Sequence, residues 1–327
     1  MRLSSFALGV LLAIEASNAW VTPGLTMTRP GLTQMQSLAP PATSGSSKGG
    51  RSEEEIKAEL ESGRILEGGK VIDFEAIKGP SNAEQALLKA KNEILESIEK
   101  YVPAGSGILG INEEVVAEVG HELGTFSTSE EIQSIAAYLR SRSKDSFFEK
   151  RGDTERSSFS DENKTRYDEI MRKAYVESGE VTSAFAKTFY LGTQLLPEAS
   201  REAIWAIYVW CRRTDEIVDA PRDSDEEMLK DLASWEMRLE NLWKYGDVED
   251  VFDLCLLDVL VKYPTLPITP FMDMIRGMLM DVPELGQDRY ETFDELHLYC
   301  YRVAGTVGLM SLPIFGCAPG FNDQIAK

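Results

Sequence analysis

The chain has 327 residues, of which 43% are hydrophobic, so it can bury the core of one large domain or of two smaller ones. Its formal net charge of −20 and pI of about 4.6 argue against a surface that binds nucleic acid, and any anionic substrate would need metal ions for its capture. There are only two histidines, His121 and His297, which excludes a poly-histidine metal site. His297 stays open as a lone acid or base, and other chemistry must come from carboxylates, arginine, lysine, aromatic rings and bound metal.

The first 51 residues have the composition of a targeting leader. Residues 1–19 combine a basic start, a short apolar run and small residues before Trp20, which predicts a signal peptide too short to span a membrane. Residues 20–51 contain no acidic residue and are rich in Ser, Thr, Pro and Gly, as in a plastid transit segment. The two parts together resemble the bipartite leader of plastids of secondary endosymbiotic origin, so we expect the protein in the plastid (chloroplast).

The alternative is a secreted protein with an unstructured linker. The cysteines argue against it, because they are widely separated and form no C-x-x-C pair, which predicts reduced and buried thiols. They are Cys211, Cys255, Cys300 and Cys317.

Residues 52–139 predict an acidic N-terminal helical extension. A capping box at Ser81–Glu84 opens a helix whose apolar face carries Leu87, Ala90, Ile94, Ile98 and Val102. A second capping box is expected at Ser127–Glu130, before Ile132, Ile135, Ala136 and Leu139 at helical spacing. These faces predict packing in a small bundle, with partner docking as the alternative. Residues 140–166 are charged and poor in apolar side chains, which predicts a linker.

From residue 167 to 327 the apolar density is high and the pattern is helical. Helices are expected over 167–186, 198–220, 224–245, 250–263, 270–281 and 294–315, with a turn at 192–197. No alternating stretch predicts a strand, and no segment is expected to span a membrane. The fold class is therefore predicted to be all-α.

One face of the helix at 198–220 carries an unusual set of side chains. Trp205, Tyr208, Arg212, Asp215 and Asp219 recur every three or four residues and so form one stripe. An arbitrary D-x-x-x-D is usually a solvated helix end, but residues 203–211 are almost wholly apolar, so this helix is interior where it reaches the charges. Two carboxylates one turn apart can share Mg²⁺ with phosphate oxygens, and an arginine can hold a phosphate with two hydrogen bonds.

A second signal lies in the last predicted helix. Gly305 and Gly308 each cost about 1 kcal/mol relative to alanine inside a helix, so a packing or functional reason is expected. The simpler reason is close helix packing, and the alternative is room for a long apolar ligand. Tyr208 and Tyr299 could then face a cationic intermediate with their rings.

Four motifs in collinear order resemble the phytoene synthases of plants and algae, a branch of the squalene/phytoene synthase family. They are A-K-T-F-Y-L-G-T at 186–193, A-I-Y-V-W-C-R-R-T-D-E-I-V-D at 206–219, D-M-I-R-G-M-L-M-D at 273–281 and the run from Phe293 to Met310. The resemblance implies the all-α isoprenoid synthase fold. It also implies head-to-head condensation of two geranylgeranyl diphosphates, through prephytoene diphosphate, to phytoene, the first committed step of carotenoid biosynthesis.

The same resemblance assigns roles to residues of this sequence. It implies that Asp215 and Asp219 bind Mg²⁺ (or Mn²⁺) and are catalytic together with Tyr208 and Tyr299. The substrate-binding residues that it implies are Lys187, Thr188, Phe189, Arg212, Asp281, Val303, Ala304, Val307 and Gly308. Asp281 matches less closely, because Arg276 and Leu279 beside it differ from what plant relatives usually carry. The lipophilic product would favour peripheral contact with a membrane and with other carotenoid enzymes.

The family also has a second aspartate-rich motif, D-V-G-E-D, on a later helix that faces the first. This sequence reaches Lys327 before such a motif, so we expect an incomplete synthase domain that cannot close the metal site by itself. Two other functions stay open. One is a squalene synthase-like enzyme that starts from farnesyl diphosphate, and the other is a non-catalytic relative that serves as an assembly or binding module.

Overall fold

The computed structural model describes residues 65–67, 70–72, 81–96, 118–143, 147–149, 161–219, 224–282, 290 and 292–316. The leader predicted at 1–51, the helix positions Ile98 and Val102, and Cys317 lie outside these residues. The chain divides into two compact units, of which one is Glu15–Lys78 and the other combines Met1–Ile14 with Gly79–Lys327.

The smaller unit contains a short antiparallel hairpin, in which β1 (Ile65–Glu67) pairs with β2 (Lys70–Ile72) and Ile65 lies opposite Ile72. The expectation that the extension at 52–139 is helical was wrong here. The sequence between the strands is Gly68-Gly69, which is a common hairpin turn, but three-residue strands are too short to show an alternating pattern.

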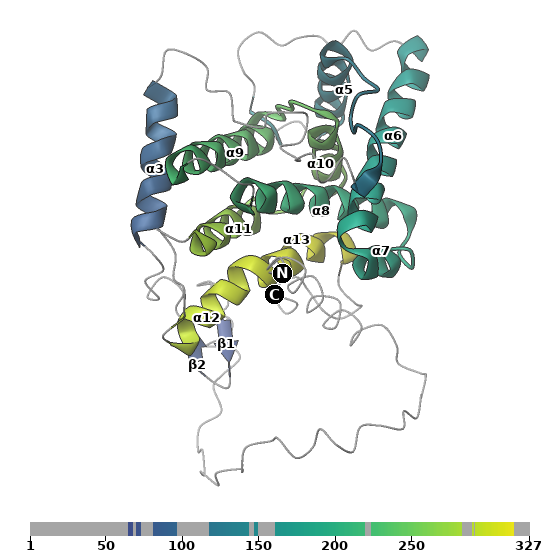
Figure 1. The fold of residues 1–327 in the computed structure, drawn as a ribbon. Helices are drawn as coiled ribbons and strands as arrows, with labels where there is room; N and C mark the ends of the chain where they lie inside the picture. The colour runs from purple at the N-terminus through teal and green to yellow at the C-terminus, as the bar shows by residue number, and fades with distance from the viewer. Residues whose placement is uncertain are drawn as a thin grey trace, which may run out of the picture. The chain divides into compact units, whose positions relative to one another are not determined.

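The regular secondary structure in the described residues of the larger unit is entirely helical (Figure 1). Its elements are α3 (Ser81–Glu96), α5 (Ser129–Arg142), α6 (Asp161–Phe185), α7 (Lys187–Thr193), α8 (Glu198–Asp219), α9 (Asp225–Tyr245), α10 (Val251–Lys262), α11 (Thr269–Met278), the 3₁₀ turn η3 (Leu279–Asp281), α12 (Phe293–Cys300), the π-turn η4 (Tyr301–Gly305) and α13 (Thr306–Phe315). The all-α prediction is confirmed for this unit.

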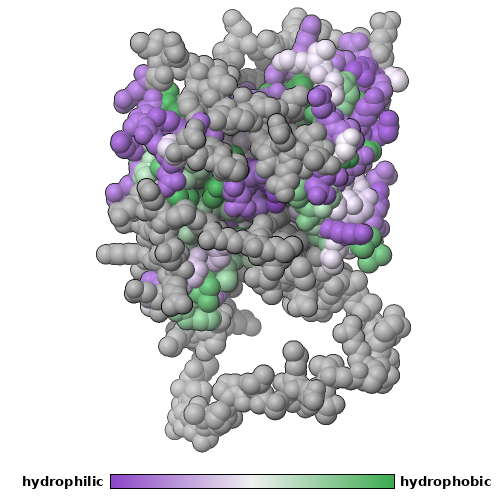
Figure 2. Space-filling model, in the orientation of Figure 1, coloured by the Kyte–Doolittle hydropathy of each residue, from purple (hydrophilic) through white to green (hydrophobic). Residues whose placement is uncertain are grey.

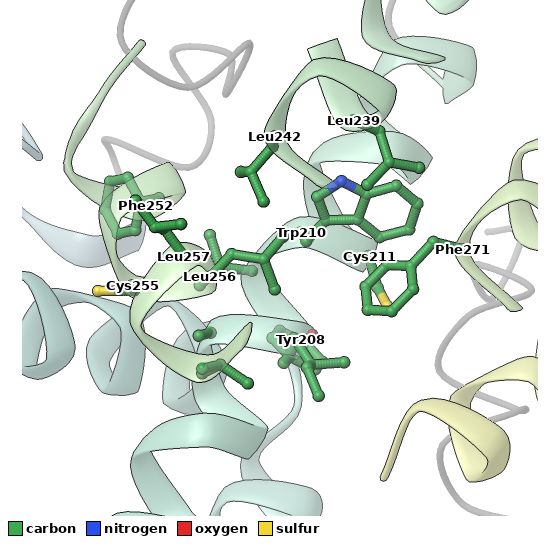
Figure 3. Packing of buried hydrophobic residues seen from close by; sticks show 14 of the residues in the cluster. Tyr208, Trp210, Cys211, Leu239, Leu242, Phe252, Cys255, Leu256, Leu257 and Phe271 are labelled. Atoms are coloured by element: carbon green, nitrogen blue, oxygen red, sulfur yellow. The ribbon is translucent and has the colours of Figure 1, made fainter. Parts of the chain in front are cut away.

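Helix α8 is the centre of the unit, and α6, α9, α10, α11 and α13 all contact it. Residues 203–211 of α8 are all buried, which confirms the interior position expected from their apolar sequence. Figure 3 shows how neighbouring helices fill the space around Trp210, whose ring meets the edge of Phe271 from α11 at 4.8 Å between centroids. Leu239 and Leu242 of α9 close the same part of the core.

Local signals fix most helix ends. Ser224 caps α9 by accepting a hydrogen bond from the Glu227 amide, and Gly246 ends the helix in the left-handed conformation with φ of 68°. Asp250 caps α10 through the amides of Phe252 and Asp253. The second capping box was predicted one residue too early, because Thr128 and Glu131 form it. Both pairs fit the S/T-x-x-E pattern, so the sequence alone could not choose between them.

The helices before residue 167 pack on the later helices. In Figure 1, α3 lies against α9, and α5 lies against α10. Packing, rather than partner docking, is confirmed for the buried faces of these two helices, which carry Ala83, Leu87 and Ala90 in α3 and Ile132, Ile135, Ala136 and Leu139 in α5. Helix α5 continues to Arg142 and α6 begins at Asp161, so both ends of the stretch 140–166 are helical.

Two further expectations differ from the structure. Cys211 and Cys255 are buried free thiols as expected, but Cys300 is exposed.

The continuous helix Phe293–Phe315 is long and apolar enough to span a membrane, although no span was expected. Core helices of soluble proteins meet the same two criteria, so length and composition alone decide nothing about a membrane. Hydrophobic residues are also exposed on the surface, whose hydropathy Figure 2 shows from one side. They include Phe293 and Leu296 of α12, Leu191 of α7, and Leu195 just after α7.

Candidate functional site

The stripe predicted on α8 is inside the molecule for most of its length. Tyr208 and Asp215 are each 3% exposed, and the Arg212 side chain is 14% exposed. Asp219 is the last residue of the helix and is exposed. The stripe therefore runs from the core to the surface, with its two aspartates at the outer end.

Arg212 is held by carboxylates of its own helix. Its Nη1 lies 3.2 Å from Asp215 Oδ2, and its Nη2 pairs with Glu216 Oε1. Its guanidinium also lies 4.4 Å from the centre of the Phe185 ring of α6. Glu216, which is 2% exposed, was not among the predicted site residues. Its spacing of four residues from Arg212 was a signal in the sequence that could have found it.

The charges at this end of α8 attract cations. Asp215 and Glu216 pair with the Arg212 guanidinium, Asp219 adds a third carboxylate at the last residue of the helix, and the last turn has no basic residue. The C-terminal end of a helix carries a partial negative charge from its carbonyl groups, which adds to the carboxylates. A bound cation would therefore lower the electrostatic free energy of this end.

Arg212 also has capacity left for an anion. Its Nε is buried and has no hydrogen-bond acceptor in the part of the chain that the structure describes. A buried donor without an acceptor is unfavourable by roughly 1–3 kcal/mol. A phosphate oxygen that accepted from this nitrogen would remove that penalty.

Helix α7 brings the first motif to the stripe. The Phe189 ring lies 5.6 Å from the Tyr208 ring between centroids, whereas Lys187 and Thr188 are exposed at the start of the helix. Tyr190 stacks on Trp205 at 5.5 Å, and the Trp205 indole donates a hydrogen bond of 2.9 Å to Thr193 Oγ1. The short helix α7 includes the first two residues of the turn expected at 192–197, so the turn itself begins at Gln194.

Helix α13 brings the last motif to the same face of α8. Met310 Sδ lies 3.8 Å from the thiol of Cys211, which belongs to the face that also carries Tyr208 and Asp215. Val303 and Val307 are buried, Ala304 is half-buried and Gly308 is exposed. Tyr299 is half-buried, and its ring lies 5.1 Å from that of Tyr290. The structure therefore brings α13, the helix of Val307 and Gly308, against α8, while Val303 and Ala304 lie in η4, which contacts α11.

The glycines of this helix differ in their surroundings. A Cβ at Gly308 would meet no heavy atom of the described residues within 4 Å, so close packing of the described helices does not explain this glycine. A Cβ at Gly305 would lie 3.3 Å from the Tyr301 ring of its own turn. Open space beside Gly308 agrees with room for a ligand.

The close approach between helices occurs instead at Gly277 of α11. A Cβ there would lie 2.9 Å from Arg302 Cβ and 3.1 Å from its carbonyl carbon. We expect Gly277→Ala to lower the free energy of unfolding by about 1–3 kcal/mol, because backbone must move to admit the methyl group. Gly192→Ala, with no atom within 4 Å of its Cβ, is the matched control in urea unfolding. Equal stability of both variants would show that α11 and η4 can separate freely.

Arg213, the neighbour of Arg212, has a different environment. Its Nη2 lies 2.7 Å from Asp250 Oδ2, and Arg238 contacts both Asp250 and Asp253. The Trp235 ring lies 4.5 Å from the Arg213 guanidinium and 5.3 Å from that of Arg238. This buried network joins α8, α9 and α10. It fixes the rotation of α8 about its own axis, so that Arg213 faces this network and Asp215 lies on a different face of the helix.

Among the described residues, no three His, Cys, Asp or Glu side chains are arranged to hold a metal ion. The carboxylates of α8 do fit Mg²⁺ in another way, since this ion is typically bound by one or two carboxylates together with substrate phosphates. The side chain of Asp281 lies outside the described residues, so its role stays a prediction.

Comparison with known proteins shows what the later part of the chain is similar to. Residues 182–326 match the squalene/phytoene synthase family. The resemblance seen in the four motifs is thereby confirmed for this segment. Over 146 residues the chain is 56% identical to 15-cis-phytoene synthase from Synechococcus elongatus, which covers 45% of this chain and 46% of that protein. It is 53% identical over 150 residues to the chloroplastic phytoene synthase 2 of Oryza sativa subsp. japonica, covering 46% of this chain and 36% of the rice protein.

This chain thus spans less than half the length of these curated relatives. Among solved structures, a dehydrosqualene synthase crystallised with a ligand is 29% identical, with a TM-score of 0.40, over 45% of this chain and 48% of that one.

Proposed function

We propose that this chain contributes the first metal and diphosphate wall of a phytoene synthase with the isoprenoid synthase fold. The reaction is head-to-head condensation of two geranylgeranyl diphosphates, through prephytoene diphosphate, to phytoene, a step of carotenoid biosynthesis. The observation that supports it most is the buried group of Arg212, Asp215 and Glu216 at the outer end of α8. The similarity to named phytoene synthases supports the choice of substrate.

Different residues of the site would bind the diphosphate and the metal ion. Arg212 would hold a diphosphate oxygen through the nitrogen that has no protein acceptor in the described residues. Asp215 and Asp219 would hold Mg²⁺ (or Mn²⁺), which when bound would neutralise charge on the diphosphate leaving group. Lys187 and Thr188 are exposed at the start of α7, where they can meet the incoming diphosphate.

Aromatic rings and apolar side chains would surround the prenyl chain. Burial raises the pKa of Tyr208, so its hydroxyl keeps its proton and the ring stays neutral. A neutral ring face attracts an allylic cation, and Phe189 holds that ring in place. Val303, Ala304, Val307 and Gly308 would form the wall that keeps water from the cation.

Metal removal tests the proposal without turnover. Although α8 forms only one wall of the metal site, its carboxylates and the substrate diphosphate can hold Mg²⁺ between them. We therefore expect the chain to bind geranylgeranyl thiodiphosphate, an analogue that ionises slowly, at least about 100-fold more tightly with Mg²⁺ than with EDTA, because several kcal/mol of charge stabilisation come from the ion. Isothermal titration calorimetry measures both affinities. Equal affinity in the two buffers would contradict a metal-dependent site and would favour an assembly module.

Product analysis separates the two enzymatic candidates. In the full-length protein we expect a C40 hydrocarbon from geranylgeranyl diphosphate by mass spectrometry, without a nicotinamide cofactor. A C30 product from farnesyl diphosphate would indicate the squalene synthase-like alternative.

The chloroplastic relatives support a plastid location, and imaging of a fluorescent fusion that keeps residues 1–51 tests the proposed leader. Flotation with liposomes tests contact with a membrane, and co-purification tests contact with other carotenoid enzymes.

A further inference from the structure

Helix α3, which precedes the segment matched by the family, packs on that segment. Ala83, Leu87 and Ala90 bury its inner face, and α3 contacts both α9 and η3. Lys91 strengthens this contact, with its Nζ 2.8 Å from Glu240 and 3.4 Å from Glu236 of α9. The apolar face and the ion pairs together give α3 a defined position on the later helices.

From this position α3 reaches the π-turn η4. Glu84 Oε1 lies 2.8 Å from Arg302 Nη2, across 218 positions of sequence. The Arg302 side chain is 14% exposed, and its other terminal nitrogen lies 3.8 Å from Met280 Sδ in η3. Arg302 is therefore enclosed between α3 and η3, and Glu84 is its carboxylate partner.

The π-turn determines where the prenyl wall lies. Thr306 donates its amide hydrogen bond to the carbonyl of Tyr301, five residues back, and its hydroxyl donates to the carbonyl of Arg302 at 2.7 Å. A π-turn inserts one extra residue into a helix, so it rotates the side chains on either side of it relative to each other. The buried wall residues Val303 and Val307 lie within and directly after this turn.

Side chains and backbone of two helices, α11 and α3, contact the π-turn. On the α11 side, the Tyr301 hydroxyl lies 3.2 Å from Asp273 Oδ2, and Gly277 admits the backbone of Arg302. On the α3 side, Glu84 holds the Arg302 side chain. If the α3 contact is lost, Arg302 keeps its backbone position at Gly277 but its side chain is no longer fixed.

We propose that Glu84 is a positioning residue for the prenyl-chain wall formed by Val303 and Val307. Helix α3 would then contribute to substrate selection through its contact with Arg302. This inference rests on the proposed function, since it assigns Val303 and Val307 to a prenyl-binding wall. A wall that is fixed at η4 discriminates between C20 and C15 chains, and a wall that is loose admits both. Because Glu84 is half-exposed, its ion pair contributes little to the stability of the whole protein, and a purely structural role would leave chain selectivity unchanged.

The test compares single and reciprocal charge changes in the full chain. For Glu84→Gln and Glu84→Arg we expect the selectivity for geranylgeranyl over farnesyl thiodiphosphate, taken as the ratio of their Kd values, to fall by roughly 10-fold. The double variant Glu84→Arg/Arg302→Glu restores the pair with reversed charges and should recover most of the selectivity. Glu93→Gln is the matched control, because it removes a carboxylate from the same helix near Lys230, at 3.8 Å, and not near η4.

A second measurement needs no ligand. Hydrogen exchange followed by mass spectrometry should show faster exchange at residues 301–308 in Glu84→Gln and normal exchange in the reciprocal variant. Faster exchange with unchanged chain selectivity, or no change in either measurement, would overturn the positioning role. If the parent chain binds neither analogue while exchange responds as expected, the proposed function fails and the prenyl-wall role with it. The coupling of α3 to η4 would then still be established.

Discussion

Asp215→Asn is expected to abolish most of the Mg²⁺-dependent affinity for a prenyl diphosphate. Asp215 is the buried carboxylate of the pair, so its charge acts in surroundings that screen it weakly. We expect a loss of about 100-fold or more in affinity, and a similar or larger loss in kcat/KM of the full-length protein. Calorimetry with geranylgeranyl thiodiphosphate and Mg²⁺ measures the first, and a product assay measures the second.

The same substitution should leave the fold intact, because Arg212 keeps Glu216 as its partner. Glu198→Gln serves as the control, since Glu198 is an exposed acid in the first turn of the same helix. Asp219→Asn should weaken binding in the same direction. Full Mg²⁺-dependent binding by Asp215→Asn would remove α8 from the metal site.

The two adjacent arginines, Arg212 and Arg213, are expected to differ in how Mg²⁺ affects the loss of stability when each is replaced by glutamine. Arg213→Gln leaves Asp250 and Asp253 paired with Arg238, so we expect the free energy of unfolding to fall by about 3–5 kcal/mol with or without Mg²⁺. Arg212→Gln removes the counter-charge of Asp215 and Glu216, and Mg²⁺ can replace that charge. Its destabilisation should therefore be smaller with Mg²⁺ than without.

Urea unfolding with and without Mg²⁺ measures both effects. The parent chain supplies the reference for each buffer. If Mg²⁺ stabilises Arg213→Gln as much as Arg212→Gln, the cation acts elsewhere and the assignment of Arg212 to the site is wrong.

Local sequence signals were enough for α8, α9, α10 and the stripe, but they missed α7 and placed the start of α6 too late. The boundaries of α8, α9 and α10 follow from Pro221, Ser224, Gly246 and Asp250, because caps and breakers act within a few residues. The burial of α8 followed from the apolar run at 203–211. The hairpin at 65–72 was missed because its strands are too short to show a period, and the capping box at Thr128 was misplaced because two overlapping boxes fit the same letters.

The sequence by itself determined that the larger unit is helical, that α8 is interior, and that Tyr208, Arg212, Asp215 and Asp219 share one face, because a helix of fixed period translates spacing directly into direction. Only the tertiary structure decided which arginine serves the carboxylates of α8 and which joins the buried network with Asp250. It also decided that α13 meets Cys211 and that α3 holds Arg302 of η4. Those contacts join side chains far apart in the sequence, and the packing of whole helices, not any local spacing, brings them together.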